Sequence, residues 1–338
     1  MNRRCDANRG FTIVEILVVI SIIAVLLGLL LPALSGVKKR SRKVQEINAI
    51  RQVGIAWNLY ANANNEAALP GYLETAVQDY WKVGYEYPDG TTIPPAPGYG
   101  AGGRNIAGPW TWRLLPNMDY NHEMVHGYRD ESDWDLLQMA GEGNEIARHP
   151  AFGYNAYYVG GWWEMVMVDF SGTAIPRYRF YNARADLNGD GTIGPDEYAS
   201  VVARSIPQIR RSSELVIFCS SAELPPMTAV QYHKLEDNVP GSHLVVPPFL
   251  AEAPQWMTAG AGAGFGPGHG PGGVIPVPGS GGPSTLEVVA NTSAPIGRYT
   301  GNVAVLYADG HSDSQAPGTL VDQRKWINIA DQGAFQHQ

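Results

Sequence analysis

Cysteine and charge are both scarce in this sequence. The 338 residues include only two cysteines, Cys5 and Cys219, which excludes a framework of several disulfides and a zinc site built from cysteines. Charged residues make up 17% of the chain, and no glycine-rich phosphate loop, nucleophile elbow or CxxC pair occurs. The sequence therefore lacks the common signatures of nucleotide hydrolases, serine hydrolases and thiol oxidoreductases. With 44% hydrophobic residues, wholesale disorder is also excluded.

The charges are distributed unevenly along the chain. The net charge is −8, but the first 43 residues hold eight Lys/Arg and two acidic residues, so residues 44–338 carry −14. An acidic body argues against nucleic-acid binding, because phosphate contacts need clustered Lys and Arg. We expect no nucleic-acid partner.

A long apolar run lies beside this basic charge. Phe11 to Leu31 is about 21 residues, or roughly 31 Å of helix, which matches the hydrocarbon thickness of a bilayer. The run continues into Pro32 and a basic cluster instead of ending at a small-residue cleavage site, so it predicts a membrane-spanning helix and not a secretory signal. Glu15 is an anomaly within it, because a carboxylate in an apolar helix is costly without a partner.

The residues around Glu15 carry a family resemblance. Arg9-Gly10-Phe11-Thr12-Ile13-Val14-Glu15 before an apolar helix resembles the class III signal of type IV pilins and type II secretion pseudopilins. The resemblance implies that a prepilin peptidase removes residues 1–10 by cutting after Gly10 and methylates the new N-terminus, Phe11. It also implies that Glu15 pairs with the terminal amine of a neighbouring subunit and sets the register between subunits.

The same resemblance implies location, partners and a structural rather than enzymatic role. It places the protein in the inner (cytoplasmic) membrane, crossing once, with the leader in the cytoplasm, the head outside and the filament in the periplasm or at the cell surface. The implied partners are other pilins or pseudopilins, the peptidase and methyltransferase, and an inner-membrane assembly platform. Charge counting favours the opposite orientation, because five Lys/Arg follow the apolar run and three precede it. We follow the family orientation, which brings Gly10 to a peptidase facing the cytoplasm.

Residues 32–70 predict an amphipathic continuation of the helix. Apolar residues recur there at steps of three or four, which predicts one buried helix face. They are Val44, Ile47, Ile50, Val53/Gly54, Trp57 and Tyr60. We expect the helix to reach about Ala68, because Leu69-Pro70-Gly71 ends it.

From residue 71 to residue 338 the pattern predicts a globular head rich in β-structure. The strand-like runs are Tyr154–Val159, Trp162–Phe170, Arg177–Tyr181, Leu215–Ser220 and Asn302–Ala308. The segments 90–109 and 260–283 are rich in Gly and Pro and predict long irregular loops. The expected fold class is α+β: a long N-terminal helix, half transmembrane and half amphipathic, packed on an antiparallel sheet.

Parts of the head resemble one subfamily of prepilin-like proteins, which carries an H-x9-DG motif near its end. The segment from Trp110 to Pro116, the strand beginning at Gly153 and the closing run from Asn302 to His311 all resemble that subfamily. Tyr299 stands where the naming histidine would be. Asp309-Gly310 predicts a hairpin turn by itself, since glycine supplies a positive φ.

Residues 186–197 fit the calcium-loop pattern D-x-[DN]-x-[DN]-G-x5-E at every position. The expected oxygen ligands are Asp186, Asn188, Asp190, the Thr192 carbonyl, a water near Gly194 and bidentate Glu197. We expect a helix to follow from Glu197. The loop has no paired partner, so we expect calcium as a structural cofactor that stabilises the head.

Two alternative functions remain at this point. His122-Glu123-Met124-Val125-His126 satisfies the H-E-x-x-H zinc pattern and would support a membrane-anchored metallopeptidase, with Glu145 as a possible third ligand. Residues Arg129 and Ser132 break the longer metzincin pattern. The other alternative is a minor, adhesive subunit at a filament tip that binds a ligand through the Gly/Pro loops.

Overall fold

The computed structural model describes most of the helix and the central part of the head. The described residues are 12–84, 107–127, 149–167, 173–178, 183–184, 198–199, 202–224, 227–228, 241–245, 249–250, 254–259, 271–275, 287–288 and 292–328. The chain divides into two units, Met1–Arg42 and Lys43–Gln338.

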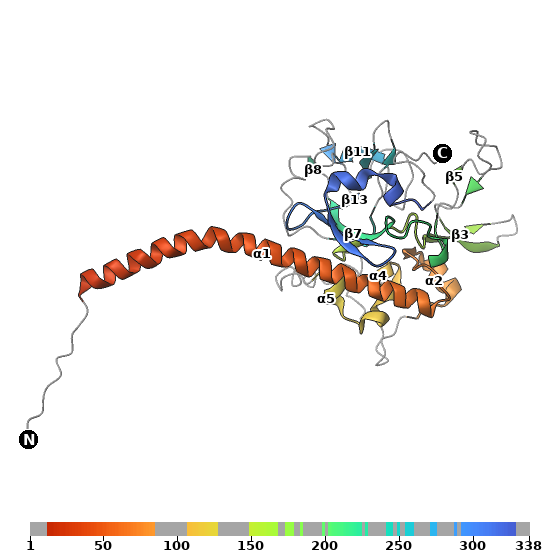
Figure 1. Cartoon of the computed structure of the whole chain (residues 1–338). Helices are drawn as coiled ribbons and strands as arrows, with labels where there is room; N and C mark the ends of the chain where they lie inside the picture. The colour runs from red at the N-terminus through yellow and green to blue at the C-terminus, as the bar shows by residue number, and fades with distance from the viewer. Residues whose placement is uncertain are drawn as a thin grey trace, which may run out of the picture. The chain divides into compact units, whose positions relative to one another are not determined.

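The first long element is the helix α1, which runs from Ile13 to Ala63 (Figure 1). In the first unit the large apolar side chains that the structure describes are all exposed, from 48% at Ile23 to 83% at Ile13. In the part of the chain that the structure describes, no helix combines the length and the apolar composition needed to cross a membrane.

The helix ends earlier than the sequence predicts. It stops at Ala63, and Asn65 and Glu66 follow in the left-handed region with φ of 54° and 63°. The expected end at Ala68 is therefore wrong, because residues in the left-handed region cannot continue a right-handed helix. Asparagine tolerates the left-handed region better than most residues do. Ala67 instead forms a β-bridge with Ser205.

In the second unit the predicted apolar face of α1 is largely confirmed. Ile50, Val53 and Trp57 are fully or almost fully buried, and Ile47 and Tyr60 pack partly buried against the same core. Val44 is the exception, with 59% of its surface exposed. Lys43 and Glu46, on either side of Val44 in the sequence, are buried instead.

The other helices of the described residues are short. They are α2 (Thr75–Trp81), α4 (Trp110–Leu114), α5 (His122–Val125) and the 3-10 helices η1 (Leu115–Met118), η2 (Ile206–Gln208), η3 (Pro317–Val321) and η4 (Gln323–Lys325).

The main sheet of the head is antiparallel, as expected. Its strands are β2 (Phe152–Tyr154), β7 (Val216–Leu224), β13 (Thr292–Pro295), β14 (Val303–Tyr307) and β15 (Ser312–Gln315). The order is β13-β7-β14-β15, and β2 also pairs with β7. Representative register pairs are Val305 with Cys219 and Gly153 with Cys219.

Smaller sheets surround this one. The strands β1 (Tyr72–Leu73), β3 (Trp162–Met167) and β4 (Ala174–Tyr178) form one, and β9 (Phe249–Leu250), β10 (Pro254–Ala259) and β11 (Pro271–Ile275) another. Two-stranded pairs join β5 (Ala183–Arg184) to β6 (Tyr198–Ala199) and β8 (Met227–Thr228) to β12 (Glu287–Val288). The β1–β3 pair is parallel, unlike the antiparallel arrangement that the sequence predicts.

A buried ion pair connects α1 to the main sheet. The Lys43 ammonium donates to Glu46 Oε2 at 2.9 Å and to the Asn302 carbonyl at 2.8 Å. The Ser220 hydroxyl on β7 donates to Glu46 Oε1 at 2.6 Å. The two charged side chains are only 7% and 1% exposed. Removing one buried partner leaves the other charge uncompensated, which is far costlier than removing both.

The pair generates a stability prediction. Lys43→Met should lower the free energy of unfolding by about 3–5 kcal/mol, because Glu46 stays buried without its cation. Denaturant unfolding of the detergent-solubilised chain measures this change. The double variant Lys43→Met/Glu46→Leu should recover much of the loss. Arg51→Met, which removes an exposed cation from the same helix, is the matched control. A Lys43 loss no larger than that of the control would contradict the assignment.

Candidate functional site

The start of α1 is a capping box. Glu15 Oε2 accepts hydrogen bonds from the Thr12 backbone N–H and from the Thr12 hydroxyl, both at 2.8 Å. The Glu15 backbone N–H in turn donates to Thr12 Oγ1 at 3.3 Å. A threonine before the helix and a glutamate three residues later satisfy two helix-end donors reciprocally. The residues that resemble an assembly signal therefore also begin the helix.

The capping box gives the Glu15 carboxylate a local role at the start of the apolar helix. Among the described residues its hydrogen bonds are local, and both Thr12 and Glu15 are exposed. A negative charge in the first turn also interacts favourably with the helix dipole. Gly10 and Phe11, the other predicted processing residues, lie outside the described residues. Pairing of Glu15 with a neighbouring subunit stays a prediction.

The predicted calcium loop also lies outside the described residues: Asp186, Asn188, Asp190, Thr192, Gly194 and Glu197 are all there. Residues that flank it on both sides are described. Ala183 pairs with Ala199 and Arg184 with Tyr198 in the antiparallel β5–β6 ladder. The helix expected after Glu197 is therefore wrong at Tyr198 and Ala199, which are a strand. The ladder brings the chain on either side of the twelve-residue loop together.

The zinc pattern falls on one short helix and its end. His122–Val125 is α5, and His126 follows it with only 1% of its surface exposed. Glu145 lies outside the described residues. No group of three or more possible metal-ligating side chains occurs among the residues that the structure describes. The second histidine of the pattern lies in the interior of the head.

The predicted turn at Asp309-Gly310 is confirmed. It joins β14 to β15, and Gly310 has a φ of +89°. The His311 backbone N–H donates to Asp309 Oδ1 at 3.0 Å, and the His311 ring stacks on Tyr307 with centroids 4.3 Å apart. Desolvation is the largest single influence on the pKa of Asp309 and raises it. The hydrogen bonds and the charge of His311 together outweigh desolvation, so the pKa of Asp309 is lowered. These contacts give the turn a structural role.

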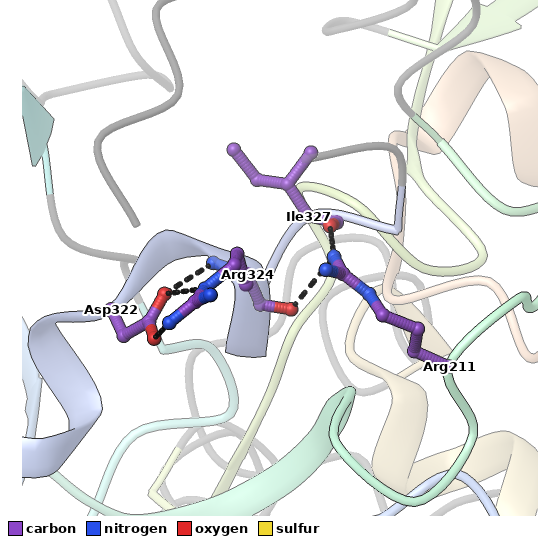
Figure 2. A network of polar contacts seen from close by, with 4 residues as sticks. All are labelled: Arg211, Asp322, Arg324 and Ile327. Carbon is purple, nitrogen blue, oxygen red and sulfur yellow. Dashed lines mark hydrogen bonds and ion pairs between the residues drawn. The ribbon is translucent and has the colours of Figure 1, made fainter. Parts of the chain in front are cut away.

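A second polar network, which the sequence did not reveal, fastens the C-terminal segment to the head. Arg211 Nη2 donates to the carbonyls of Arg324 and Ile327, both at 3.2 Å (Figure 2). Asp322 begins η4 by accepting from the Arg324 backbone N–H and pairs with the Arg324 guanidinium at 2.6 Å. These partners lie more than a hundred residues from Arg211, so no local spacing could have identified them.

Comparison with known proteins identifies the N-terminal segment. The sequence model of the prokaryotic N-terminal methylation motif matches residues 5–31. This confirms the predicted type IV pilin-like prepilin signal. Searches of curated proteins and of solved structures found no match. A signal of this kind implies processing by a prepilin peptidase, membrane anchoring through the N-terminal helix and assembly into pilus-like filaments.

The capping box generates a prediction for the start of α1. Thr12→Ala removes the hydroxyl that bonds to the Glu15 N–H and carboxylate, so the first turn should lose about 1 kcal/mol of stability. Amide hydrogen exchange of residues 13–17 in detergent micelles should become about fivefold faster. Thr12→Ser keeps the hydroxyl and should exchange at the original rate. Equal exchange in the two variants would show that the hydroxyl does not cap the helix.

Proposed function

We propose that this protein is a structural subunit of a type IV pilus-like or type II secretion pseudopilus filament. The observation that carries the proposal is the methylation motif at residues 5–31, which coincides with the start of a helix whose described large apolar side chains are exposed throughout the first unit. Such a surface is unfavourable in water and suits lipid before assembly and neighbouring helices afterwards.

In this proposal the peptidase cuts after Gly10, and Phe11 becomes the methylated N-terminus. The new amine is then adjacent to Thr12, at a helix end where a positive charge is unfavourable. Glu15 of a neighbouring subunit compensates for this charge. Thr12 occupies Oε2 of the carboxylate, and the amine of a neighbouring subunit pairs with Oε1. Holding the carboxylate in one rotamer before assembly reduces the entropy lost when the pair forms.

The rest of the proposal concerns the head. The C-terminal half of α1 forms its core with the main sheet, which attaches the head firmly to the filament helix. We propose that residues 186–197 bind calcium as a structural cofactor outside the cytoplasm, where even weak sites of this type are filled. The β5–β6 ladder supports this, because it pairs the residues that flank the loop and so reduces the entropy lost when the loop closes around an ion.

Processing and assembly are separable by mutation. Gly10→Val should block cleavage, because the peptidase requires a small residue there in proteins with this signal. Mass spectrometry of the membrane fraction should then show the unprocessed chain. Glu15→Gln should be cleaved and methylated normally but should reduce filament yield by an order of magnitude or more, since the buried amine loses its counter-charge. A Gly10→Val chain of mature mass would refute the cleavage assignment.

Calcium removal should destabilise the head. Ligand at a hundred times its dissociation constant stabilises a folded state by about 2.7 kcal/mol, so excess chelator should lower the melting temperature by several degrees. Asp190→Asn/Glu197→Gln should melt at the chelated temperature with or without calcium. Asp313→Asn, which removes an exposed carboxylate from β15, should retain the calcium response. The absence of a shift in the original protein would count against the loop.

A further inference from the structure

A set of basic residues follows the exposed apolar part of α1 directly. We call Lys38, Lys39, Arg40 and Arg42 the basic collar. Leu34 and Val37, just before it, are 65% and 62% exposed, so the apolar surface continues up to the collar. Lys38, Lys39 and Arg40 are exposed, and Arg42 is half-buried. All four belong to the first unit.

The collar extends over more than half of the helix circumference and does not form a single narrow face. At about 100° per residue, Arg42 lies about 40°, Lys39 about 100° and Arg40 about 200° around the axis from Lys38. A partner protein that lies along one side of the helix would select charges on one face. Charges distributed over more than half of the circumference suit an environment that surrounds the helix.

Lys43 shows by contrast that these positions differ in role. It is also basic and follows Arg42 directly, but its ammonium donates to the Asn302 carbonyl. The Lys43 side chain is 7% exposed, and that of its partner Glu46 is 1% exposed. The collar residues precede this buried pair. Between Glu15 and Glu46 the sequence contains no acidic residue, so the charge of this stretch of helix is entirely positive.

We propose that the basic collar binds the head groups of anionic phospholipids. The collar lies at the end of an apolar surface about as long as a bilayer is thick, which places its cations at the depth of the phosphates. Basic residues next to a membrane segment each gain about 1 kcal/mol near an anionic surface, equivalent to about fivefold in affinity. The inference rests on the proposed function for the membrane anchoring of α1, and it holds in either leaflet.

The proposal also accounts for the charge distribution that opposes the expected orientation. Five Lys/Arg follow the apolar run and three precede it, although positive residues normally accumulate on the cytoplasmic side. Four of those five are the collar, and the fifth, Lys43, is used inside the head. A role in lipid binding would give these four positions a reason to be basic on this side of the apolar run.

Lipid co-purification tests the collar. The full chain is reconstituted in nanodiscs of phosphatidylethanolamine with a minority of phosphatidylglycerol, then extracted gently, and the retained lipids are quantified by mass spectrometry. The original protein should retain phosphatidylglycerol enriched at least fivefold over the nanodisc ratio, and raised salt should reduce the enrichment. The variant with Gln at positions 38, 39, 40 and 42 should retain both lipids at the nanodisc ratio.

The matched control replaces four exposed basic residues of the head with Gln: Arg51, Lys82, Arg204 and Arg210. It changes the net charge equally and should keep the original enrichment. Equal enrichment in the collar variant and the original protein would overturn the proposal, as would a lack of enrichment in the original protein. A chain that does not enter the nanodisc overturns the proposed membrane anchoring as well, whereas one that enters with unchanged lipid ratios overturns the collar alone.

Discussion

The close approach of α1 to the strand β14 is the contact on which the head depends. A Cβ atom at Gly54 would lie 2.7 Å from Leu306 Cδ2, so only glycine allows this spacing without a shift. Ala49 and Ala56 are buried small side chains of the same helix. The Trp57 indole N–H donates to the Tyr154 hydroxyl at 3.3 Å. Because β14 pairs with β7, and β7 pairs with β2 and β13, the helix orients the whole main sheet.

Buried polar groups determine where the chain enters and leaves this core. The Lys43–Glu46 pair lies on α1 at the start of the second unit. Arg113 lies in the last turn of α4. Arg113 donates to the carbonyls of Pro70, Ala107 and Gly108, and desolvation, the largest cause, lowers its pKa to about 10. Three carbonyl acceptors replace the water that this guanidinium loses. The described core thus contains the compensated Lys43–Glu46 pair as well as the Arg113 cation, which backbone carbonyls hold.

Local signals predicted well what depends on local structure. The apolar spacing of Ile50, Val53 and Trp57 located the buried face of α1, and Asp309-Gly310 located a turn that only a positive φ permits. The burial of Glu46 could not be predicted, because its partner Ser220 comes from a distant strand. The parallel β1–β3 pair and the β5–β6 ladder also join segments whose proximity depends on the tertiary fold. Thr12 and Glu15 had the spacing of a capping box, but the role expected from their resemblance concealed the simpler local one.

These two roles of Glu15 are compatible because of where the proposed cut falls. The capping box uses Thr12 and Glu15, and the first α-helical hydrogen bond runs from the Ile16 N–H to the Thr12 carbonyl. Cleavage after Gly10 lies upstream of all these groups, so the mature chain keeps every atom that begins the helix. Processing then adds a cation at a helix end that already holds an oriented carboxylate. A single subunit cannot neutralise its neighbour's amine and its own with one charge, so the pairing favours a chain of subunits, each supplying the acid for the next.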